Sequence, residues 1–384
     1  MSAIFILAAG MFALGLDAYV VAGLLPGITS AFGIDAAEAG QAVSVFTFCY
    51  AAAAPMFATL LAGKPVRRVL VTALAIFAAA NAASALSSSF AMLLAARAVA
   101  GLGAGLFSPV AVAAAAALVP PERKGRALGL TLGGMSTGTV VGVPIGLWIS
   151  AQAGWRATLW LVTGVGLIAL LGVLRKLPNL PVAPPPSLAE RLAMLTHRRV
   201  AAIAGISFLT AVASLGLYTY VSPMLAALTG TTHITPFLWF WGLGGLVGSF
   251  CIGPLIDGTR RPACLLAIIL ALLTLALASI PTLAAWGALA FVPFLIWGAA
   301  GWSSLAPQQH MLLELQPQHG AVAVAVNSSC NYLGSAAGTV LGGVLITLGA
   351  NPAALPYDAA AVSGVALLAH LFKQMAMRRR RTAS

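Results

Sequence analysis

Two ionisable side chains lie inside long apolar stretches of this 384-residue chain, and they are the residues best suited to acid–base chemistry. Asp17 stands about midway along the first stretch, and no cation lies near it in the sequence. A carboxylate in an apolar environment costs several kcal/mol unless it is solvated, paired or protonated. Asp17 is therefore predicted to be a proton carrier. The alternative is that it caps a break in the backbone or lies in a water-filled vestibule.

Arg97 is the one lysine or arginine that falls within an apolar stretch and away from its ends. A guanidinium stays charged at any workable pH, so it cannot release protons itself. It can modulate a nearby acid or hold an anionic group. The alternative is a structural role, in which Arg97 donates hydrogen bonds to backbone carbonyls.

Polar and aromatic side chains recur at helical spacing in the second part of the chain. Asn327 and Asn331 stand four residues apart, as do Ser214 and Tyr218. Such faces meet a substrate cavity or form hydrogen bonds between helices, because lipid would not tolerate them. Flat amphipathic side chains that could hold a ligand accompany them, although aromatic residues near helix ends also serve as interfacial anchors: Tyr19, Tyr50, Tyr218, Trp297 and Trp302.

The composition sets the class of the elements that must position these residues. Hydrophobic residues make up 60% of the chain and charged residues 7%, against roughly 25% charged in soluble domains. Apolar runs of about 20 residues recur, each long enough to cross a bilayer as a helix. The sequence thus predicts an all-α integral membrane protein with twelve transmembrane helices, at 3–25, 39–61, 69–88, 90–118, 124–150, 156–176, 200–228, 235–256, 262–281, 284–312, 320–349 and 357–376.

One long interruption divides these spans six and six. Residues 177–199 carry Pro178, Pro181 and three consecutive prolines from 184 to 186, a stiff extended stretch. Ser187 then opens a short amphipathic helix with Leu188, Leu192 and Leu195 on one side. We expect a bundle over 1–176, a linker over 177–199, a second bundle over 200–376 and a basic tail over 377–384.

The two bundles are predicted to be copies of each other. Residues 14–20 match residues 215–221, and Gly138–Thr139–Val140–Val141–Gly142 matches Gly338–Thr339–Val340–Leu341–Gly342. The matches fall in corresponding spans at nearly the same offset. An even number of spans repeated across a linker predicts parallel, pseudo-symmetric halves.

Basic residues cluster at alternate connections and at the C-terminal end, where residues 378–381 are all arginine. If the spans alternate, all of these clusters fall on one side, and the opposite loops hold Arg156 as their lone basic residue. The positive-inside rule then places both termini and the linker in the cytoplasm.

The net charge of +12 does not indicate nucleic-acid binding, because the basic residues occupy short loops without an interleaved aromatic surface. The four cysteines form no CxxC pair and read as small core residues rather than metal ligands. Phosphate-loop, HExxH and GxSxG motifs are absent from the sequence. We therefore expect no enzyme and no cofactor, with an ion gradient as the source of energy.

Glycines at four-residue spacing mark the fifth span. Gly134, Gly138, Gly142 and Gly146 form a groove that admits another helix, and Pro144 lies among them. We expect this groove at the seam between the halves, facing Gly244 and Gly248 of the eighth span.

Four segments together resemble the major facilitator superfamily, and within it the drug:proton antiporter branch that includes sugar-efflux and chloramphenicol-efflux permeases. Residues 93–105 are similar to the family's fourth-helix motif, 134–146 to its antiporter motif, and 119–123 and 154–158 are typical of the branch. The resemblance implies the family's fold, a link between the glycine motif and antiport, and a role for Arg97 in proton coupling.

The loop after the second span departs from the family pattern, because Ala62 and Pro65 stand where an Asp and a Gly are usual. The gating role that the family gives this loop, with Arg67 and Arg68, then passes in part to its second-half counterpart: Asp257, Arg260 and Arg261.

These observations favour a proton-coupled efflux antiporter that works by alternating access, with a drug or sugar as substrate and a link to multidrug resistance. We expect a monomer in the cell inner (plasma) membrane whose partners are a small molecule and the lipid bilayer, and no nucleic acid. An uptake symporter or facilitator is the alternative within transport. A receptor or assembly factor is the alternative from another class, disfavoured by the short loops.

The expected topology can be checked by labelling. Single cysteines introduced as Ser187→Cys and Asp35→Cys should react with a membrane-impermeant thiol reagent from opposite faces of the membrane, because the basic connections place residue 187 in the cytoplasm. Labelling of both positions from outside the cell would contradict the arrangement.

Overall fold

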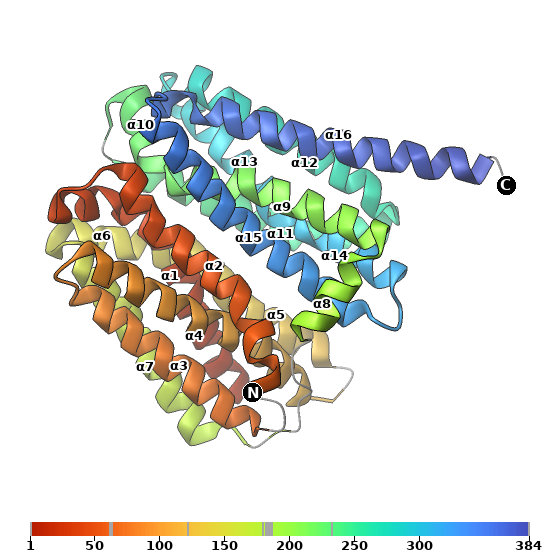
Figure 1. Ribbon diagram of the computed structural model, residues 1–384, viewed down its shortest axis with the longest axis horizontal. Coiled ribbons are helices and arrows are strands. Elements are labelled where there is room, and N and C mark those ends of the chain that lie inside the picture. Colours follow the sequence, from red (N-terminus) through yellow and green to blue (C-terminus); the bar gives the residue numbers. More distant parts are fainter. Residues whose placement is uncertain are drawn as a thin grey trace. The chain divides into compact units, whose positions relative to one another are not determined.

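A computed structural model describes residues 2–60, 64–120, 123–178, 180, 187–231 and 233–382. Within these ranges the regular elements are all helices, as the composition predicts. The chain divides into two compact units, Met1–Leu188 and Ala189–Ser384 (Figure 1). Pro181, the prolines at 184–186 and Ala62, all singled out in the sequence, lie outside the described ranges.

The first unit consists of five continuous helices and one interrupted helix. Its elements are α1 (Ser2–Phe32), α2 (Ala36–Leu60), α3 (Val66–Ala85), α4 (Phe90–Ala117), α5 (Lys124–Thr137), the π-helical turn η2 (Gly138–Gly142), α6 (Val143–Ala153) and α7 (Trp155–Lys176).

The second unit repeats this plan with more interruptions. Its elements are α8 (Leu188–Leu195), α9 (Arg198–Thr219), α10 (Val221–Thr229), α11 (Thr235–Thr259), α12 (Pro262–Leu283), η3 (Gly287–Phe291), α13 (Val292–Ser303), α14 (Leu305–Leu315), α15 (Gly320–Thr347), η4 (Pro352–Ala354) and α16 (Leu355–Thr382).

The helices account for the predicted spans. In the part of the chain that the structure describes, eleven helical segments are long and apolar enough to cross a membrane. The remaining long helix, α2, has 25 residues and completes the first unit's six. Several predicted spans contain breaks: the fifth is α5–η2–α6, the seventh is α9–α10 and the tenth is η3–α13–α14.

The break in the fifth span has a local cause. Pro144 has no backbone N–H and cannot donate to the carbonyl four residues earlier. The ladder adapts over Gly138–Gly142, where the Val143 N–H reaches back five residues to the Gly138 carbonyl. π-helices are rare and occur mostly as single turns of this kind inside α-helices, where they accompany kinks.

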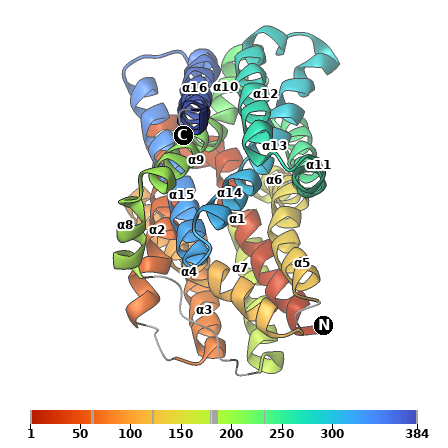
Figure 2. The ribbon, with the colours of Figure 1, turned by 90° about the vertical axis from the view of Figure 1, so that its right-hand side faces the viewer.

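The two segments that match in the sequence pack against each other in both units. In the first unit, a Cβ added at Gly138 would meet the backbone of Phe12 and Leu16; in the second, one added at Gly338 would meet Val212 and Gly216. These positions correspond at an offset of 200 in the numbering, Phe12 with Val212 and Leu16 with Gly216. Figure 1 and Figure 2 show α9 beside α15. The close approach of the first and fifth spans thus occurs twice.

The predicted partner of the glycine row was wrong. Gly134 abuts the Ala8 carbonyl, Gly138 abuts Phe12 and Gly142 abuts Leu16, so the row receives α1 of its own unit. Gly244 and Gly248 instead abut Leu295 and Ala299 of α13, within the second unit. Glycine allows close backbone contact wherever two helices meet, so its spacing alone does not identify the partner helix.

The short linker helix α8 lies where the sequence places it, directly after Ser187. Its Arg191 is buried and donates hydrogen bonds to the Ala325 carbonyl (3.2 Å) and the Ser329 Oγ (2.6 Å) of α15. Burial lowers the pKa of the Arg191 guanidinium. The leucines of α8 at positions 188, 192 and 195 are exposed, as an amphipathic helix at a bilayer surface requires.

Two neighbouring glycines test the packing of α5 on α1. Gly134→Ala should lower the thermal stability of the detergent-solubilised protein by about 1–3 kcal/mol, because the new methyl group meets the Ala8 carbonyl. Gly133→Ala is the matched control, since no atom lies within 4 Å of its Cβ position. It should stabilise the helix slightly, because alanine has the higher helix propensity. Equal effects of the two substitutions would contradict this packing.

Candidate functional site

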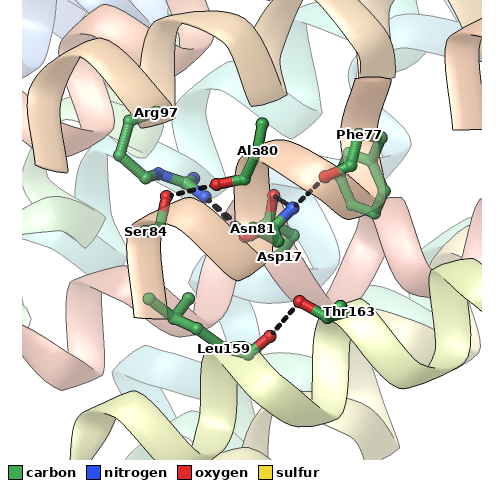
Figure 3. Close-up of polar contacts among 8 residues, drawn as sticks. All are labelled: Asp17, Phe77, Ala80, Asn81, Ser84, Arg97, Leu159 and Thr163. Atoms are coloured by element: carbon green, nitrogen blue, oxygen red, sulfur yellow. Dashed lines mark hydrogen bonds and ion pairs between the residues drawn. The ribbon is translucent and has the colours of Figure 1, made fainter. Parts of the chain in front are cut away.

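Asp17 lies at the centre of a polar cluster in the first unit (Figure 3). Its carboxylate is fully buried and accepts a hydrogen bond at 2.6 Å from an Nη1–H of Arg97 on α4. The second carboxylate oxygen accepts a hydrogen bond at 3.2 Å from the Asn81 side-chain amide on α3. Both oxygens of Asp17 are thus occupied, each by a different helix.

Asn81 links the two charged groups. Its amide nitrogen also donates to the Phe77 carbonyl at 3.1 Å, which fixes the orientation of the side chain. Its amide oxygen accepts from Arg97 Nη1 at 3.4 Å. The sequence analysis missed Asn81, although it is the one amide side chain in the apolar run of α3, and that rarity was the available signal.

Arg97 is held between its polar partners and an aromatic ring. Its guanidinium carbon lies 4.2 Å from the ring centroid of Phe46 on α2, a cation–π distance. Its Nε has no hydrogen-bond partner among the described residues. The hydrogen bonds that Arg97 makes in this part of the chain go to side chains, not to the backbone carbonyls that the structural alternative supposed.

Three glycines in the turns that follow Arg97 bring the neighbouring helices close to α4. A Cβ at Gly101 would meet the Phe46 carbonyl, and one at Gly105 would meet the Tyr50 carbonyl, both on α2. A Cβ at Gly103 would meet the backbone of α3 at Phe77. The glycine-rich sequence after Arg97 therefore allows α2, which carries Phe46, and α3, which carries Asn81, to lie close to α4.

The cluster contains an acid, the carboxyl group of Asp17, in direct contact with the cation of Arg97. The Asp17–Arg97 pair has no net charge, which makes it tolerable in an apolar interior. Adding a proton to Asp17 would remove the ion pair and leave the buried Arg97 charge without its counter-ion. A buried charge without a counter-ion is strongly destabilising, so each of the two side chains requires the other.

The second unit contributes an aromatic cluster from α9, α11 and α13. Trp297 Nε1 donates to Ser214 Oγ at 2.7 Å. The ring centroid of Tyr218 lies 4.4 Å from that of Trp241 and 6.3 Å from that of Trp297. The ring centroids of Trp302 and Trp241 are 6.0 Å apart. Four predicted cavity residues (Ser214, Tyr218, Trp297 and Trp302) thus come together around Trp241, which the sequence analysis did not select.

The remaining predicted cavity residues are distributed more widely. Tyr50 is buried, with its ring 6.2 Å from that of Phe46, which places it at the edge of the Asp17 cluster. Tyr19 is half-buried on α1. Asn327 is fully buried and Asn331 is half-buried on α15.

The predicted gating residues occupy helix ends. Arg67 donates a hydrogen bond to the Leu174 carbonyl of α7, and Arg68 is exposed. Asp257, Arg260 and Arg261 are exposed at the end of α11 and the start of α12, and no ion pair joins them in the described part of the chain. Arg260 has a positive φ of 51°, at the cap where α11 ends.

The fold and the buried ion pair define a multi-pass membrane transporter. A family model described as Major Facilitator Superfamily matches residues 7–339. The chain belongs to this superfamily.

Relatives agree with this assignment. The chain is 29% identical to the inner membrane transport protein YdhP of Escherichia coli K12, over 94% of this chain and 93% of the relative. It is 36% identical to a chloramphenicol resistance protein of Streptomyces lividans, over 69% of each. Among solved structures, a D-xylose–proton symporter superposes with a TM-score of 0.74 at 16% identity (96% of each chain). The nucleoside transporter NupG superposes with a TM-score of 0.77 at 13% identity, over 97% of this chain and 99% of that one.

A double-mutant cycle tests the ion pair. Asp17→Leu alone should lower the free energy of unfolding by about 3–5 kcal/mol, because Arg97 remains buried and unpaired. Combining it with Arg97→Met removes both charges and should recover much of that loss in a thermal-unfolding assay of the purified protein. Strictly additive losses in the double variant would show that the two side chains do not interact.

Proposed function

We propose that this protein is a proton-coupled efflux antiporter for small, uncharged or weakly charged amphipathic molecules. The single observation that supports this most is the buried Asp17–Arg97 pair with Asn81, a titratable site inside a membrane-spanning unit. The relative from Streptomyces lividans, a chloramphenicol resistance protein, supports efflux of such molecules. The buried carboxylate of Asp17, paired with a cation, supports proton coupling.

In this proposal, Asp17 exchanges its bond to Arg97 for a proton when the site opens to the side of higher proton concentration. Protonation releases Arg97, and the cost of its unpaired charge favours the alternative access state. Return of the proton to the other side restores the pair. A membrane potential supplies about 2.3 kcal/mol per charge per 100 mV, so one proton per cycle can drive a modest substrate gradient.

The same proposal includes the location and the substrate class. The related YdhP is an inner membrane protein, which supports the same location here. The basic connections favour an orientation with both termini in the cytoplasm. The ion pair is neutral as a whole and the cluster around Trp241 is aromatic, which suits a substrate without strong charge. A monomer with one small-molecule substrate is the simplest working unit.

Asp17→Asn tests the coupling, because it keeps the shape of the side chain while removing the titrating group. In proteoliposomes with an imposed pH gradient, the variant should lose uphill efflux of chloramphenicol but retain downhill exchange. The decisive measurement is substrate-induced proton release from the purified protein, which should disappear in the variant.

Two results would contradict the proposal. Proton release at wild-type stoichiometry from Asp17→Asn would show that another group carries the proton. Accumulation of substrate together with inward proton flow in the wild type would identify an uptake symporter instead.

A further inference from the structure

Two carboxamide side chains in the second unit are buried without a hydrogen-bond partner in the described part of the chain. Gln308 on α14 and Asn327 on α15 are both 0% exposed. The amide nitrogen and the amide oxygen of each lack a hydrogen-bond partner among the residues that the structure describes. Native proteins bury few such groups, and a pair of complete carboxamides therefore indicates a partner that is not part of the chain.

The packing of the hairpin places the two carboxamides at one level. A four-residue connection joins α14 to α15, so the two helices are antiparallel. Leu312 and Ala323 pack in one apolar cluster near that connection. Gln308 stands four residues before Leu312, and Asn327 four residues after Ala323. One helical turn from the cluster on each helix therefore brings both side chains to the same height and the same face.

Ser207 adds a third polar atom from α9. Ile203 belongs to the same apolar cluster, and Ser207 follows it by one helical turn. Ser207 is 0% exposed, and its Oγ likewise has no partner in the described ranges. Because α9 runs parallel to α15, as the contacts of Gly334 with Phe208 and of Gly338 with Val212 require, this turn extends in the same direction as that of Asn327.

The chemistry of this set indicates what it binds. Each carboxamide offers N–H donors and a carbonyl acceptor, and the hydroxyl of Ser207 can donate or accept. The three side chains carry no charge. Arg191, a cation that contacts α15, donates to the Ala325 carbonyl and the Ser329 Oγ. Such a site matches a neutral group that both donates and accepts, and it offers an ion no counter-charge.

We propose that Gln308, Asn327 and Ser207 form a binding site for a neutral hydroxyl or amide group of the transported molecule. This inference rests on the proposed transport function and deepens it. Substrate recognition then takes place on uncharged side chains of the second unit, whereas the proton binds at Asp17 in the first unit. The site also selects among amphipathic molecules: those with hydroxyl or amide groups bind, and permanent cations do not benefit from it.

The test uses apolar substitutions of matched size in the full-length protein. Gln308→Met and Asn327→Leu remove the hydrogen-bonding groups but keep the volume, and both variants should fold because they remove buried polar atoms. Binding is measured in detergent, without a gradient, as ligand-induced thermal stabilisation. Two probes, chloramphenicol and isopropyl thiogalactoside, are neutral and carry hydroxyl groups. The third is chloramphenicol with both hydroxyls methylated, and the fourth is the cation ethidium.

The wild type should bind a neutral hydroxyl-bearing probe, and each variant should bind it on the order of ten-fold more weakly, the value of about one hydrogen bond. The variants should also lose the preference for chloramphenicol over its methylated analogue. Gln309→Met, on the next residue of α14, is the matched control and should bind as the wild type does.

Wild-type affinity in both variants would overturn the inference and would show that the site holds water only. A wild type that binds ethidium alone, or none of the neutral probes, would also overturn it. These outcomes are separate from failure of the proposed antiport, because binding in detergent depends neither on a proton gradient nor on the direction of transport.

Discussion

Asp17 and Arg97 constrain each other in the first unit, because neither charge is tolerable when it is buried without the other. Three helices must therefore meet at one point: α1 supplies the carboxylate, α4 the guanidinium, and α3 the amide that bridges them. The glycines that follow Arg97 allow α2 and α3 to approach α4 closely enough. The buried charges must be paired, and the glycines of α4 allow the close helix packing around them.

The same constraint makes the site responsive. A fully apolar core would be insensitive to protons, and a solvent-exposed carboxylate would bind them without consequence for the structure. A buried pair changes its stability by several kcal/mol when one member is neutralised. That energy is comparable with what a transmembrane proton gradient provides, which is the basis of the proposed antiport.

The two units share a scaffold and differ in chemistry. The contact of Gly138 with Phe12 and Leu16 recurs as the contact of Gly338 with Val212 and Gly216, so the close packing of the first and fifth spans is duplicated. The polar content is not: the first unit buries the Asp17–Arg97 ion pair, whereas the second has Tyr218 within an aromatic cluster and buried carboxamides that are uncharged. Duplication preserves what packing requires, whereas side chains at the interior positions are free to take separate roles.

The sequence by itself determined the class of the protein, the helices and the residues at unusual depth. A helix in hydrocarbon forms all its backbone hydrogen bonds within its own segment. A run of about twenty apolar residues is therefore enough to predict it. Asp17 and Arg97 were recognisable for the same reason. That they pair was decided by the tertiary structure, since 80 residues separate them and the pairing depends on how three helices pack. Asn81 was missed although its rarity in an apolar helix was a signal; its bonds to Asp17 and Arg97 depend on how the helices pack. The prediction of the helix that packs on the glycine row was wrong, because small residues permit close packing but do not specify which helix approaches. The facing of Gln308 and Asn327 likewise follows from helix register, which apolar periodicity does not specify.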